Sequence, residues 1–236
     1  MIPNPWDAGS ARVLAALGFR ALATTSSGFA FTLGRSDGQV TLDEVVEHTR
    51  AIVEATPLPV AVDLENGYGA TPADVARAVA AAADAGAAGG SIEDYDPSGH
   101  IYPVEDAVER IGAAVEAAAG RFVLTARAEN LIRGVDDLDD TIARLQAYER
   151  AGADVVYAPG LRDAEQIRAV HAAVSKPLNV LAHHGLTLRE AFDAGAQRVS
   201  VGGGLAFAAV EAFVAAAERI RDDGDFSRLR GSGVVP

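Results

Sequence analysis

The side chains of this chain that could carry chemistry lie in three short charged clusters, each placed directly after an apolar run. The first cluster begins at Asp63, the second contains Glu93 and the third contains Arg127. If the apolar runs are neighbouring parallel strands, their carboxyl ends meet at one edge and the charged side chains converge there. Carboxylates gathered around one arginine can hold a hard cation together with an anionic ligand.

Four carboxylates are candidate metal ligands at this edge. Asp63 and Glu65 are two residues apart, so an extended chain points both the same way. Glu93 ends the next strand and Asp37 follows the preceding one, so both can reach the same rim. A single acidic residue there is more often a helix cap or ion-pair partner, but burying four like charges would raise their pKa values unless a cation neutralised them. Oxygen ligands without cysteine suit Mg²⁺ or Mn²⁺.

Two further groups of polar residues are candidates for substrate binding and proton transfer. A segment after the strand 21–25 offers hydroxyls and backbone N–H groups to a carboxylate or phosphate. Its candidate substrate-binding residues are Thr25, Ser26, Ser27 and Gly28. His184, one of two adjacent histidines after the strand 177–182, is a candidate acid or base. Adjacent residues point to opposite sides, so at most one of the pair faces the centre, and an exposed or structural histidine is the competing interpretation.

The composition of the 236-residue chain is typical of one globular domain with a well-buried core. Hydrophobic residues make up 49% and charged residues 22%, which is not the composition of a disordered chain. The absence of cysteine excludes disulfides, thiolate metal sites and cysteine nucleophiles. No apolar stretch reaches the ~20 residues of a membrane span, and the start lacks the features of a signal peptide. We therefore expect a cytoplasmic protein without a membrane partner.

The charge of the chain bears on its partners. A formal net charge of −13 argues against nucleic acid, because phosphates require a basic surface. It does not argue against a small anionic substrate, since local charge can oppose the net sign. We expect a small anionic ligand and no nucleic acid.

Short β-branched runs alternate along the chain with longer segments of helical apolar spacing. Thr41 and Glu44 predict a capping box for a helix over 42–55, and Thr71 predicts the cap of a helix that Gly86 ends. Further helices are expected at 11–17, 138–150, 163–174, 187–193 and 205–222. The expected strands are 21–25, 58–63, 89–93, 122–127, 154–158, 177–182 and 198–201.

This alternation predicts parallel strands joined by right-handed crossovers. Seven strands are clear, and residues 1–3 are expected to be the stump of an eighth, which makes an α/β (β/α)₈ TIM barrel with a single domain over 1–236. An open doubly wound sheet is the competing architecture, but no glycine fingerprint follows the first strand and no composition break marks a second domain. The abrupt start predicts that an N-terminal segment is missing.

The chain is similar over nearly its whole length to the isocitrate lyase/phosphoenolpyruvate mutase superfamily. The resemblance is carried by the segments 4–11, 24–28, 33–38, 62–69, 92–94, 126–130, 156–161 and 199–202. It implies a barrel of the phosphoenolpyruvate/pyruvate type that binds Mg²⁺ and a 2-oxo or enol carboxylate. Members make or break C–C or P–C bonds through an enolate-like intermediate. They commonly form homo-dimers or tetramers by exchanging a C-terminal helix, for which 205–222 is the candidate here.

The resemblance also implies roles for individual residues. Asp63 matches the direct metal ligand, and Glu65 stands where the family usually has a second aspartate. Asp37 and Glu93 match positions that bind the metal through water. Arg127 matches the arginine that binds the substrate carboxylate.

The loop whose backbone amides hold the other end of the substrate matches Ser26 and Ser27, and departures elsewhere narrow the reaction. The lyases of the family carry a Lys-Lys-Cys-Gly-His loop whose cysteine is the catalytic acid and base, and the short segment 95–100 replaces it here. Ala23 and Pro159 replace a tryptophan and a histidine of the mutases. Isocitrate and methylisocitrate lyase activity is therefore not expected, and P–C chemistry is disfavoured.

We predict a Mg²⁺-dependent (or Mn²⁺-dependent) carbon–carbon lyase that decarboxylates or cleaves a small 2-oxo dicarboxylate such as oxaloacetate. Arg127 and Glu93 would act at the reacting group, and water or His184 would reprotonate the enolate. One alternative is the P–C chemistry of a phosphoenolpyruvate mutase or phosphonopyruvate hydrolase. The other is a non-catalytic protein that binds a keto acid.

Overall fold

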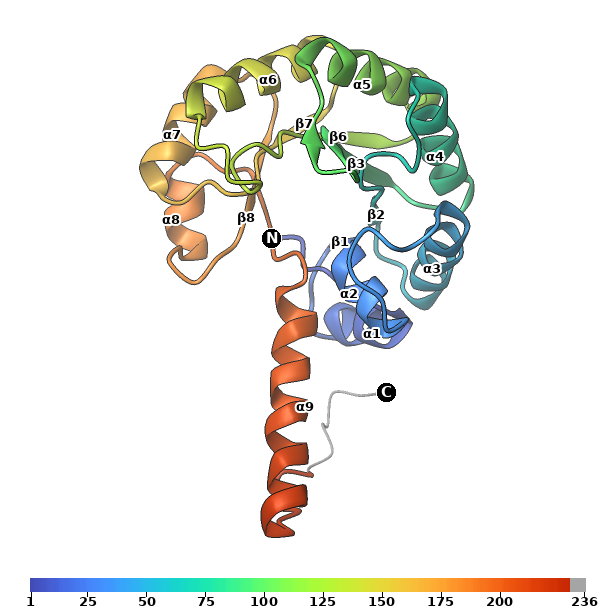
Figure 1. Cartoon of the computed structure of the whole chain (residues 1–236), viewed down its shortest axis with the longest axis vertical. Coiled ribbons are helices and arrows are strands. Elements are labelled where there is room, and N and C mark those ends of the chain that lie inside the picture. The colour runs from blue at the N-terminus through green and yellow to red at the C-terminus, as the bar shows by residue number, and fades with distance from the viewer. Residues whose placement is uncertain (230–236) are drawn as a thin grey trace.

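A ring of parallel strands surrounded by helices forms the body of the protein, and this computed structural model describes residues 1–229 (Figure 1). The strands follow in the order β1-β2-β3-β6-β7-β8-β9, and each pairs in parallel with the next. They are β1 (Leu22–Ala23), β2 (Val60–Asp63), β3 (Gly89–Glu93), β6 (Val123–Arg127), β7 (Val155–Tyr157), β8 (Leu178–Leu181) and β9 (Arg198–Ser200). Residues 230–236 of the predicted domain lie outside the described part.

The first residues of the chain occupy the gap between β9 and β1. Ile2 forms a parallel bridge with Ser200, and its N–H donates to the carbonyl of Val199 at 2.8 Å. On the other side, the N–H of Ala23 donates to the carbonyl of Pro3 at 3.1 Å. The stump of an eighth strand is therefore where the sequence predicts it, and the TIM barrel is confirmed.

Helices follow the strands, and most of them cover the outside of the ring (Figure 1). They are α1 (Ala8–Ala16), α2 (Ser26–Thr32), α3 (Leu42–Ala55), α4 (Pro72–Asp84), α5 (Val104–Ala118), α6 (Leu138–Arg150), α7 (Ala164–Ala173), α8 (Leu188–Asp193) and α9 (Gly204–Asp223). The predicted capping box of Thr41 with Glu44 is present, and Thr71 caps α4 with Pro72 in its first turn. These caps satisfy backbone N–H groups that a helix start leaves unpaired.

The apolar spacing explains why the helices lie flat on the strands. In α4 the buried residues are Val75, Ala78, Val79 and Ala82, which recur every three or four positions and form one stripe. Val75, Val79 and Ala82 belong to the same core cluster as Val62 in β2 and Ile92 in β3. Burying this stripe therefore fixes the ends of β2 and β3, where the charged clusters begin.

Two local predictions from the sequence are wrong. The hydroxyl-rich segment is not a loop, because Ser26, Ser27 and Gly28 form the first turn of α2 and Thr25 is its N-cap, accepting from the N–H of Gly28. The first helix starts at Ala8, earlier than the predicted residue 11, since Asp7 and Ser10 form a capping box. Ser and Thr favour turns as well as helix caps, so their composition alone does not separate the two.

The segment that replaces the cysteine loop of the lyases is a small antiparallel hairpin. Its strands are β4 (Tyr95–Asp96) and β5 (His100–Ile101). The hydroxyl of Tyr102 donates to Asp96 at 3.0 Å, which ties the base of the hairpin together. The hairpin stands over the ends of β3 and β6, beside the charged clusters (Figure 1).

The last helix, α9, leaves the body instead of covering it (Figure 1). It is 20 residues long, and Phe213 on it is 73% exposed. Ala206, near its start, is the buried residue of this helix. Among the described residues, no helix combines the length and apolar character needed to cross a membrane.

Candidate active site

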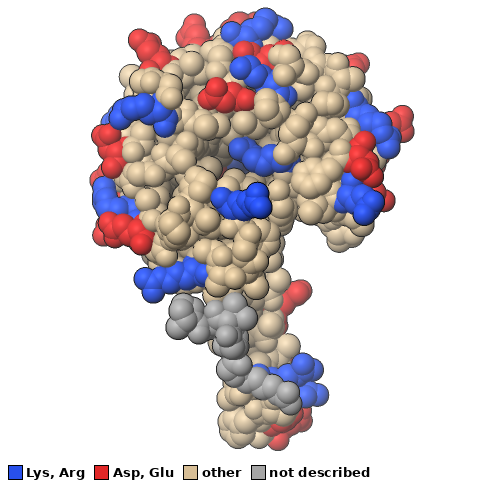
Figure 2. Space-filling view, turned by 180° about the vertical axis from the view of Figure 1, so that it is seen from behind, with Lys and Arg blue, Asp and Glu red and all other residues tan. Residues whose placement is uncertain are grey.

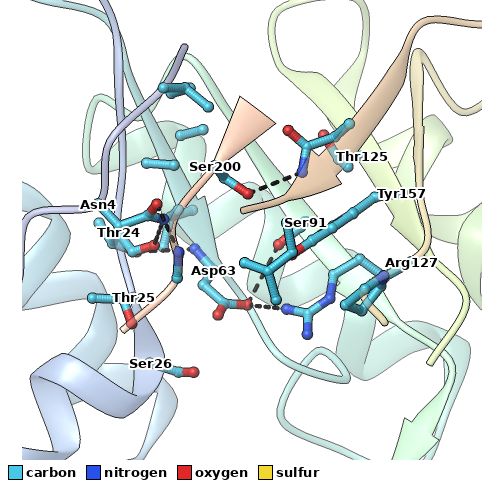
Figure 3. A pocket seen from close by; sticks show the side chains of 18 of the residues that line it. Asn4, Thr24, Thr25, Ser26, Asp63, Ser91, Thr125, Arg127, Tyr157 and Ser200 are labelled. Atoms are coloured by element: carbon cyan, nitrogen blue, oxygen red, sulfur yellow. Dashed lines mark hydrogen bonds and ion pairs between the residues drawn. The ribbon is translucent and has the colours of Figure 1, made fainter. Parts of the chain in front are cut away.

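A cavity of about 190 Å³ lies inside the ring, where the strands carry polar side chains (Figure 3). Of the residues that the sequence predicts for the site, it is lined by Thr25, Ser26, Ser27, Asp37, Asp63 and Arg127. A hollow beside it shares Ser26, Asp37 and Arg127 and adds Glu65 and Glu93. The charged clusters of three strands therefore meet at one end of the barrel, as predicted.

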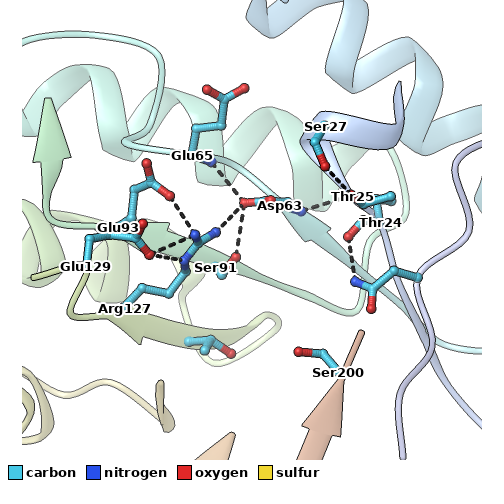
Figure 4. Close-up of polar contacts among 12 residues, drawn as sticks. Thr24, Thr25, Ser27, Asp63, Glu65, Ser91, Glu93, Arg127, Glu129 and Ser200 are labelled. Atoms are coloured by element: carbon cyan, nitrogen blue, oxygen red, sulfur yellow. Dashed lines mark hydrogen bonds and ion pairs between the residues drawn. The ribbon is translucent and has the colours of Figure 1, made fainter. Parts of the chain in front are cut away.

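Arg127, the last residue of β6, lies at the centre of this charged group (Figure 4). Its Nη1 donates to Asp63 at 2.9 Å, and its Nη2 lies 2.9 Å from Glu93 and 2.8 Å from Glu129. Burial alone would lower the pKa of Arg127, but the three carboxylates raise it well above its usual value. The ring of Tyr157 packs against the guanidinium, 5.4 Å from centroid to Cζ. Arg127 is thus a fixed positive charge in every relevant pH range.

Asp63, the last residue of β2, is held from two sides (Figure 3). Its backbone N–H donates to the hydroxyl of Thr24 at 2.9 Å, which fixes the strand end against β1. Its Oδ1 accepts from Arg127 and, at 3.4 Å, from the hydroxyl of Ser91. Its Oδ2 accepts no hydrogen bond from any residue in 1–229. One carboxylate oxygen of Asp63 is therefore left for a further ligand.

Glu65 does not continue the alternation of β2, contrary to the prediction from spacing. The strand ends at Asp63, and Glu65 has a φ of 47°, so its side chain turns away from the Arg127 pair (Figure 4). The hydroxyl of Tyr68 donates to its carboxylate at 2.9 Å. Burial, followed by the charge of Asp63, raises the pKa of Glu65 to about 7. The side chain still lies at the rim, near enough to Asp63 and Asp37 to be repelled by both.

Asp37 lies at the mouth of the cavity, in the segment after α2. Its pKa is raised by desolvation and by Asp63, and a hydrogen bond with the Ser26 side chain opposes this rise. Thr25 and Ser27 face one another across the first turn of α2, with their hydroxyl oxygens 3.2 Å apart. The helix and its N-cap therefore present Thr25, Ser26 and Ser27 to the cavity from the β1 side. Gly28, also predicted to bind substrate, is buried and lines neither the cavity nor the hollow beside it.

Arg127 is also held by Glu93 and by Glu129, a residue not singled out from the sequence. Glu93 is buried, which raises its pKa, and Arg127 offsets this rise in part. Glu129 is 1% exposed, and its Oε1 accepts from the Nε of Arg127 at 2.9 Å. Arg133 lies 3.2 Å from Glu129 and stacks on the ring of Tyr95 in the hairpin. Glu129 follows Arg127 by two residues, so the alternation rule that linked Asp63 and Glu65 could have identified it.

Asp94, next to Glu93 in the second cluster, faces away from the cavity. Its carboxylate accepts from the hydroxyl of Tyr148 and from Arg144, both on α6, and from the N–H of Glu129. Adjacent residues of a strand end point to opposite sides, so one member of the pair serves the site and the other ties α6 to the barrel.

His184 is not brought into the cluster. It is exposed in the turn before α8 and lines neither the cavity nor the hollow beside it. His183 is more buried, and its Nδ1 accepts from the N–H of Gly185 while its Nε2 has no hydrogen-bond partner among the described residues. The two rings pack edge to face, 6.2 Å apart.

The carboxylates fit a Mg²⁺ ion that is bound mainly through water. No three Asp, Glu or His side chains in residues 1–229 are arranged to surround a cation directly. Mg²⁺ commonly needs only one or two carboxylates and keeps several waters. Asp63 has a free carboxylate oxygen, and the mutual repulsion of Asp37, Asp63 and Glu65 is the repulsion that a cation would relieve. The donor set is oxygen only, as this ion prefers.

Comparison with known proteins places this geometry in a family. A family model described as phosphoenolpyruvate phosphomutase matches residues 1–221. The chain is 36% identical to 2-methylisocitrate lyase of Escherichia coli over 68% of this chain, and 32% identical to oxaloacetate decarboxylase of Pseudomonas putida over 78%. These alignments span 57% and 66% of the two relatives, so the chain covers less than two thirds of their length.

Solved structures agree with these sequence matches. A protein of Burkholderia cenocepacia J2315, described as a lyase/mutase without a firmer assignment, has 51% sequence identity and a TM-score of 0.94. The match covers 98% of this chain and 87% of that one. The fold therefore has a counterpart in a solved structure along almost the whole chain.

Proposed function

The chain belongs to the phosphoenolpyruvate phosphomutase family, within the isocitrate lyase/phosphoenolpyruvate mutase superfamily, and from this membership we propose that it is a Mg²⁺-dependent carbon–carbon lyase. The proposed substrate is a small 2-oxo dicarboxylate such as oxaloacetate, and the proposed reaction is decarboxylation or C–C cleavage through an enolate. The relative named 2-methylisocitrate lyase supports a lyase reaction, and the relative named oxaloacetate decarboxylase supports this substrate class.

The observation that carries the proposal is the pairing of Arg127 with Asp63 inside the cavity. Arg127 is held by Glu93 and Glu129 at Nη2 and Nε, so these two carboxylates fix its orientation. Among the side chains of residues 1–229, its Nη1 bonds to Asp63 alone. If Asp63 turns to a cation, Nη1 becomes available for the carboxylate of a substrate, and one movement prepares both binding groups.

In the proposed mechanism, the residues of the chain bind and orient the substrate. A bound Mg²⁺ would supply a Lewis acid for the 2-oxo oxygen, held by Asp63 with Asp37, Glu65 and Glu93 acting through water. Arg127 binds the substrate carboxylate and places it beside that oxygen. As the C–C bond breaks, the positive charge at this end of the cavity stabilises the electron pair left as an enolate.

The second half of the proposed mechanism concerns the proton and the other end of the substrate. Backbone N–H groups of Ser26 and Ser27 in the first turn of α2 orient the substrate from the β1 side. Decarboxylation needs no acid or base to begin, which fits a chain without cysteine. We assign the reprotonation of the enolate to water, because His184 is exposed outside the cavity.

The proposal is tested by calorimetric titration of oxalate, a mimic of the enolate of pyruvate, with and without Mg²⁺. We expect Mg²⁺-dependent binding that is lost in Asp63→Ala and retained in Asp84→Ala, which removes an exposed carboxylate at the last residue of α4. Oxaloacetate turnover should fall at least about 100-fold in Asp63→Ala. Absence of oxalate binding under both conditions would mean that the carboxylates are structural.

Turnover assays also separate the alternatives. The description of the family model names a phosphomutase, so phosphonopyruvate is the second substrate to assay. Turnover of phosphonopyruvate without turnover of oxaloacetate would favour P–C chemistry. Tight oxalate binding without turnover of either compound would indicate a protein that binds keto acids and does not transform them.

A further inference from the structure

Inside the barrel, one partly buried guanidinium has no carboxylate partner among the described residues. Arg198 is the first residue of β9 and lines the cavity, yet none of the ion pairs within residues 1–229 includes it. Burial lowers the pKa of Arg198 to about 10, and only Tyr157 opposes this effect. A buried positive charge without a counter-ion is costly, and an anionic ligand would offset that cost.

Neutral groups hold Arg198 in one orientation. Its Nε donates to the amide oxygen of Asn179 at 2.8 Å, and its Nη2 donates to the hydroxyl of Thr125 at 2.8 Å. The amide nitrogen of Asn179 in turn donates to the hydroxyl of Ser200 at 3.0 Å. The third nitrogen, Nη1, makes no hydrogen bond with any described residue. The guanidinium is therefore positioned in advance, with donor capacity left for a ligand.

Arg198 lies one step deeper in the same cavity than Arg127. Thr125, which Arg198 contacts, precedes Arg127 by two residues on β6, so both side chains face the interior about 7 Å apart along the strand. Carboxylates surround Arg127, whereas hydroxyl and amide groups surround Arg198. The cavity thus has one end suited to a cation and one carboxylate, and a second end with an uncompensated positive charge.

The interior has room between the two ends. Barrels of this kind usually fill their centre with bulky branched side chains. Here the small residues Ala23, Ala61 and Ser91 are among those that line the cavity. Seen from behind, the body is hollowed near its centre, with Lys or Arg side chains beside the hollow and Asp and Glu side chains farther out (Figure 2).

We propose that Arg198 binds the second carboxylate of the substrate, so that the site selects 2-oxo dicarboxylates over 2-oxo monocarboxylates. This inference rests on the proposed lyase function and names the group that sets its substrate class. Arg127 and the metal ligands take the 2-oxo carboxylate at the rim, and the distal carboxylate lies toward Nη1 of Arg198 in the interior.

Binding of the distal carboxylate by Arg198 should affect KM and not kcat. A guanidinium stabilises a carboxylate anion but not neutral CO₂, so pairing with a departing carboxylate aids binding and not bond breaking. Loss of Arg198 should then raise KM for oxaloacetate without lowering kcat. A purely structural arginine would lower kcat or the amount of folded protein instead.

The experiment compares wild type with Arg198→Met, which keeps much of the volume and removes the charge. We expect KM for oxaloacetate to rise about tenfold or more, the range for a hydrogen bond to a charged group. The affinity for oxalate and the inhibition by pyruvate, which lacks the distal carboxylate, should change less than about twofold. An equal loss of affinity for oxaloacetate, oxalate and pyruvate would overturn the proposal. An unchanged KM for oxaloacetate would also overturn it.

Further variants distinguish the loss of the Arg198 interaction from misfolding of Arg198→Met. Asn179→Asp is isosteric and would give Arg198 the carboxylate partner that it lacks. This variant should therefore raise KM for oxaloacetate in the same way, while oxalate binding persists. Arg198→Lys should recover part of the affinity.

The two proposals fail in different ways. If wild type binds no oxalate with Mg²⁺, the proposed function is wrong. If oxalate binds but oxaloacetate is not turned over, the assay becomes competition by malate, a four-carbon dicarboxylate. Malate should displace oxalate from wild type about tenfold better than from Arg198→Met, and equal displacement would refute the role of Arg198 alone.

Discussion

At the level of single residues, the site is organised by one arginine and the carboxylates that share it. Arg127 bonds to Asp63 through Nη1, to Glu93 through Nη2, and to Glu129 through both Nη2 and Nε. All of these distances are 2.9 Å or less. Two of the carboxylates are buried and one lines the cavity, so they have unequal freedom to exchange partners. Orientation of Arg127 is therefore the property most sensitive to substitution.

Glu129→Gln tests this. The variant keeps the shape of the side chain but removes the charge that holds Nε and Nη2 of Arg127, so kcat/KM for oxaloacetate should fall about 10- to 100-fold. Steady-state kinetics would measure the fall, and circular dichroism would confirm that the variant is folded. Unchanged kcat/KM would show that Glu93 alone positions Arg127.

The residue-level predictions from sequence succeed where the strand is regular. Asp63 and Arg127 end their strands and meet, as expected from parallel pairing. Glu65 differs because the strand has already ended and its φ is positive, a change of backbone that residue types do not reveal. Arg198 was missed because a single charged residue before an apolar run reads as a surface position, and only the register of β9 shows that it faces inward.

At the level of elements, α2 and α3 are joined to the start of the chain through His48. The ring of His48 stacks on Phe29 with centroids 3.8 Å apart, and its Nε2 donates to the carbonyl of Trp6 at 2.9 Å. Burial lowers the pKa of His48, although the Trp6 carbonyl and Asp7 oppose the shift. The neutral ring is thus the form that holds these elements together.

The pH dependence of stability follows from that shift. The unfolded chain titrates His48 near 6.5, so above this pH both states are neutral and the contact contributes fully. As the pH falls through 6.5 and then through the lower folded pKa, the unfolded state takes up the proton first and the free energy of unfolding decreases. Urea titrations from pH 8 to pH 5 should show a steeper loss for wild type than for His48→Gln. Parallel curves for the two proteins would contradict this role.

Elements with a strong local signal were predictable and short ones were not. The capping boxes of α3 and α4 and the apolar stripe of α4 depend on residues that are close in the sequence. Both helices could therefore be predicted from the sequence. The hairpin of β4 and β5 has two-residue strands, which are too short to show a period. Its position depends on Tyr102, which directly follows β5, and on Arg133, which lies well beyond the hairpin in the sequence.

At the level of the whole molecule, α9 leaves an apolar surface exposed. Phe213 is 73% exposed and Phe207 46%, and α9 projects away from the body (Figure 1). A separate apolar hollow on the body is lined by Phe19, Leu186 and Val199, among others. Large apolar side chains that are exposed together on one helix are typical of an interaction site. We propose that a second copy of the chain covers α9, in a homo-dimer or tetramer.

Phe213→Glu tests the assembly. A charge in the apolar contact should shift the protein toward monomer in sedimentation velocity at micromolar concentration, because an unpaired charge is costly to bury. Asp222→Ala, an exposed polar position on the same helix, should leave the assembly unchanged. A wild type that is already monomeric at these concentrations would rule out this proposal.

The closure of the barrel has a consequence for the order in which the protein is made. Asn4 accepts at its amide oxygen from the N–H groups of Val201 and Gly202 and donates to the carbonyl of Thr24. The bonds to Val201 and Gly202 join positions that are 197 and 198 residues apart in the sequence. During synthesis, residues 2–4 can pair with β1, but their other edge therefore stays unpaired until β9 has left the ribosome. The intervening units can already pair in sequence. An unpaired edge is open to other chains, so the nascent protein is most vulnerable to aggregation just before its last strand emerges.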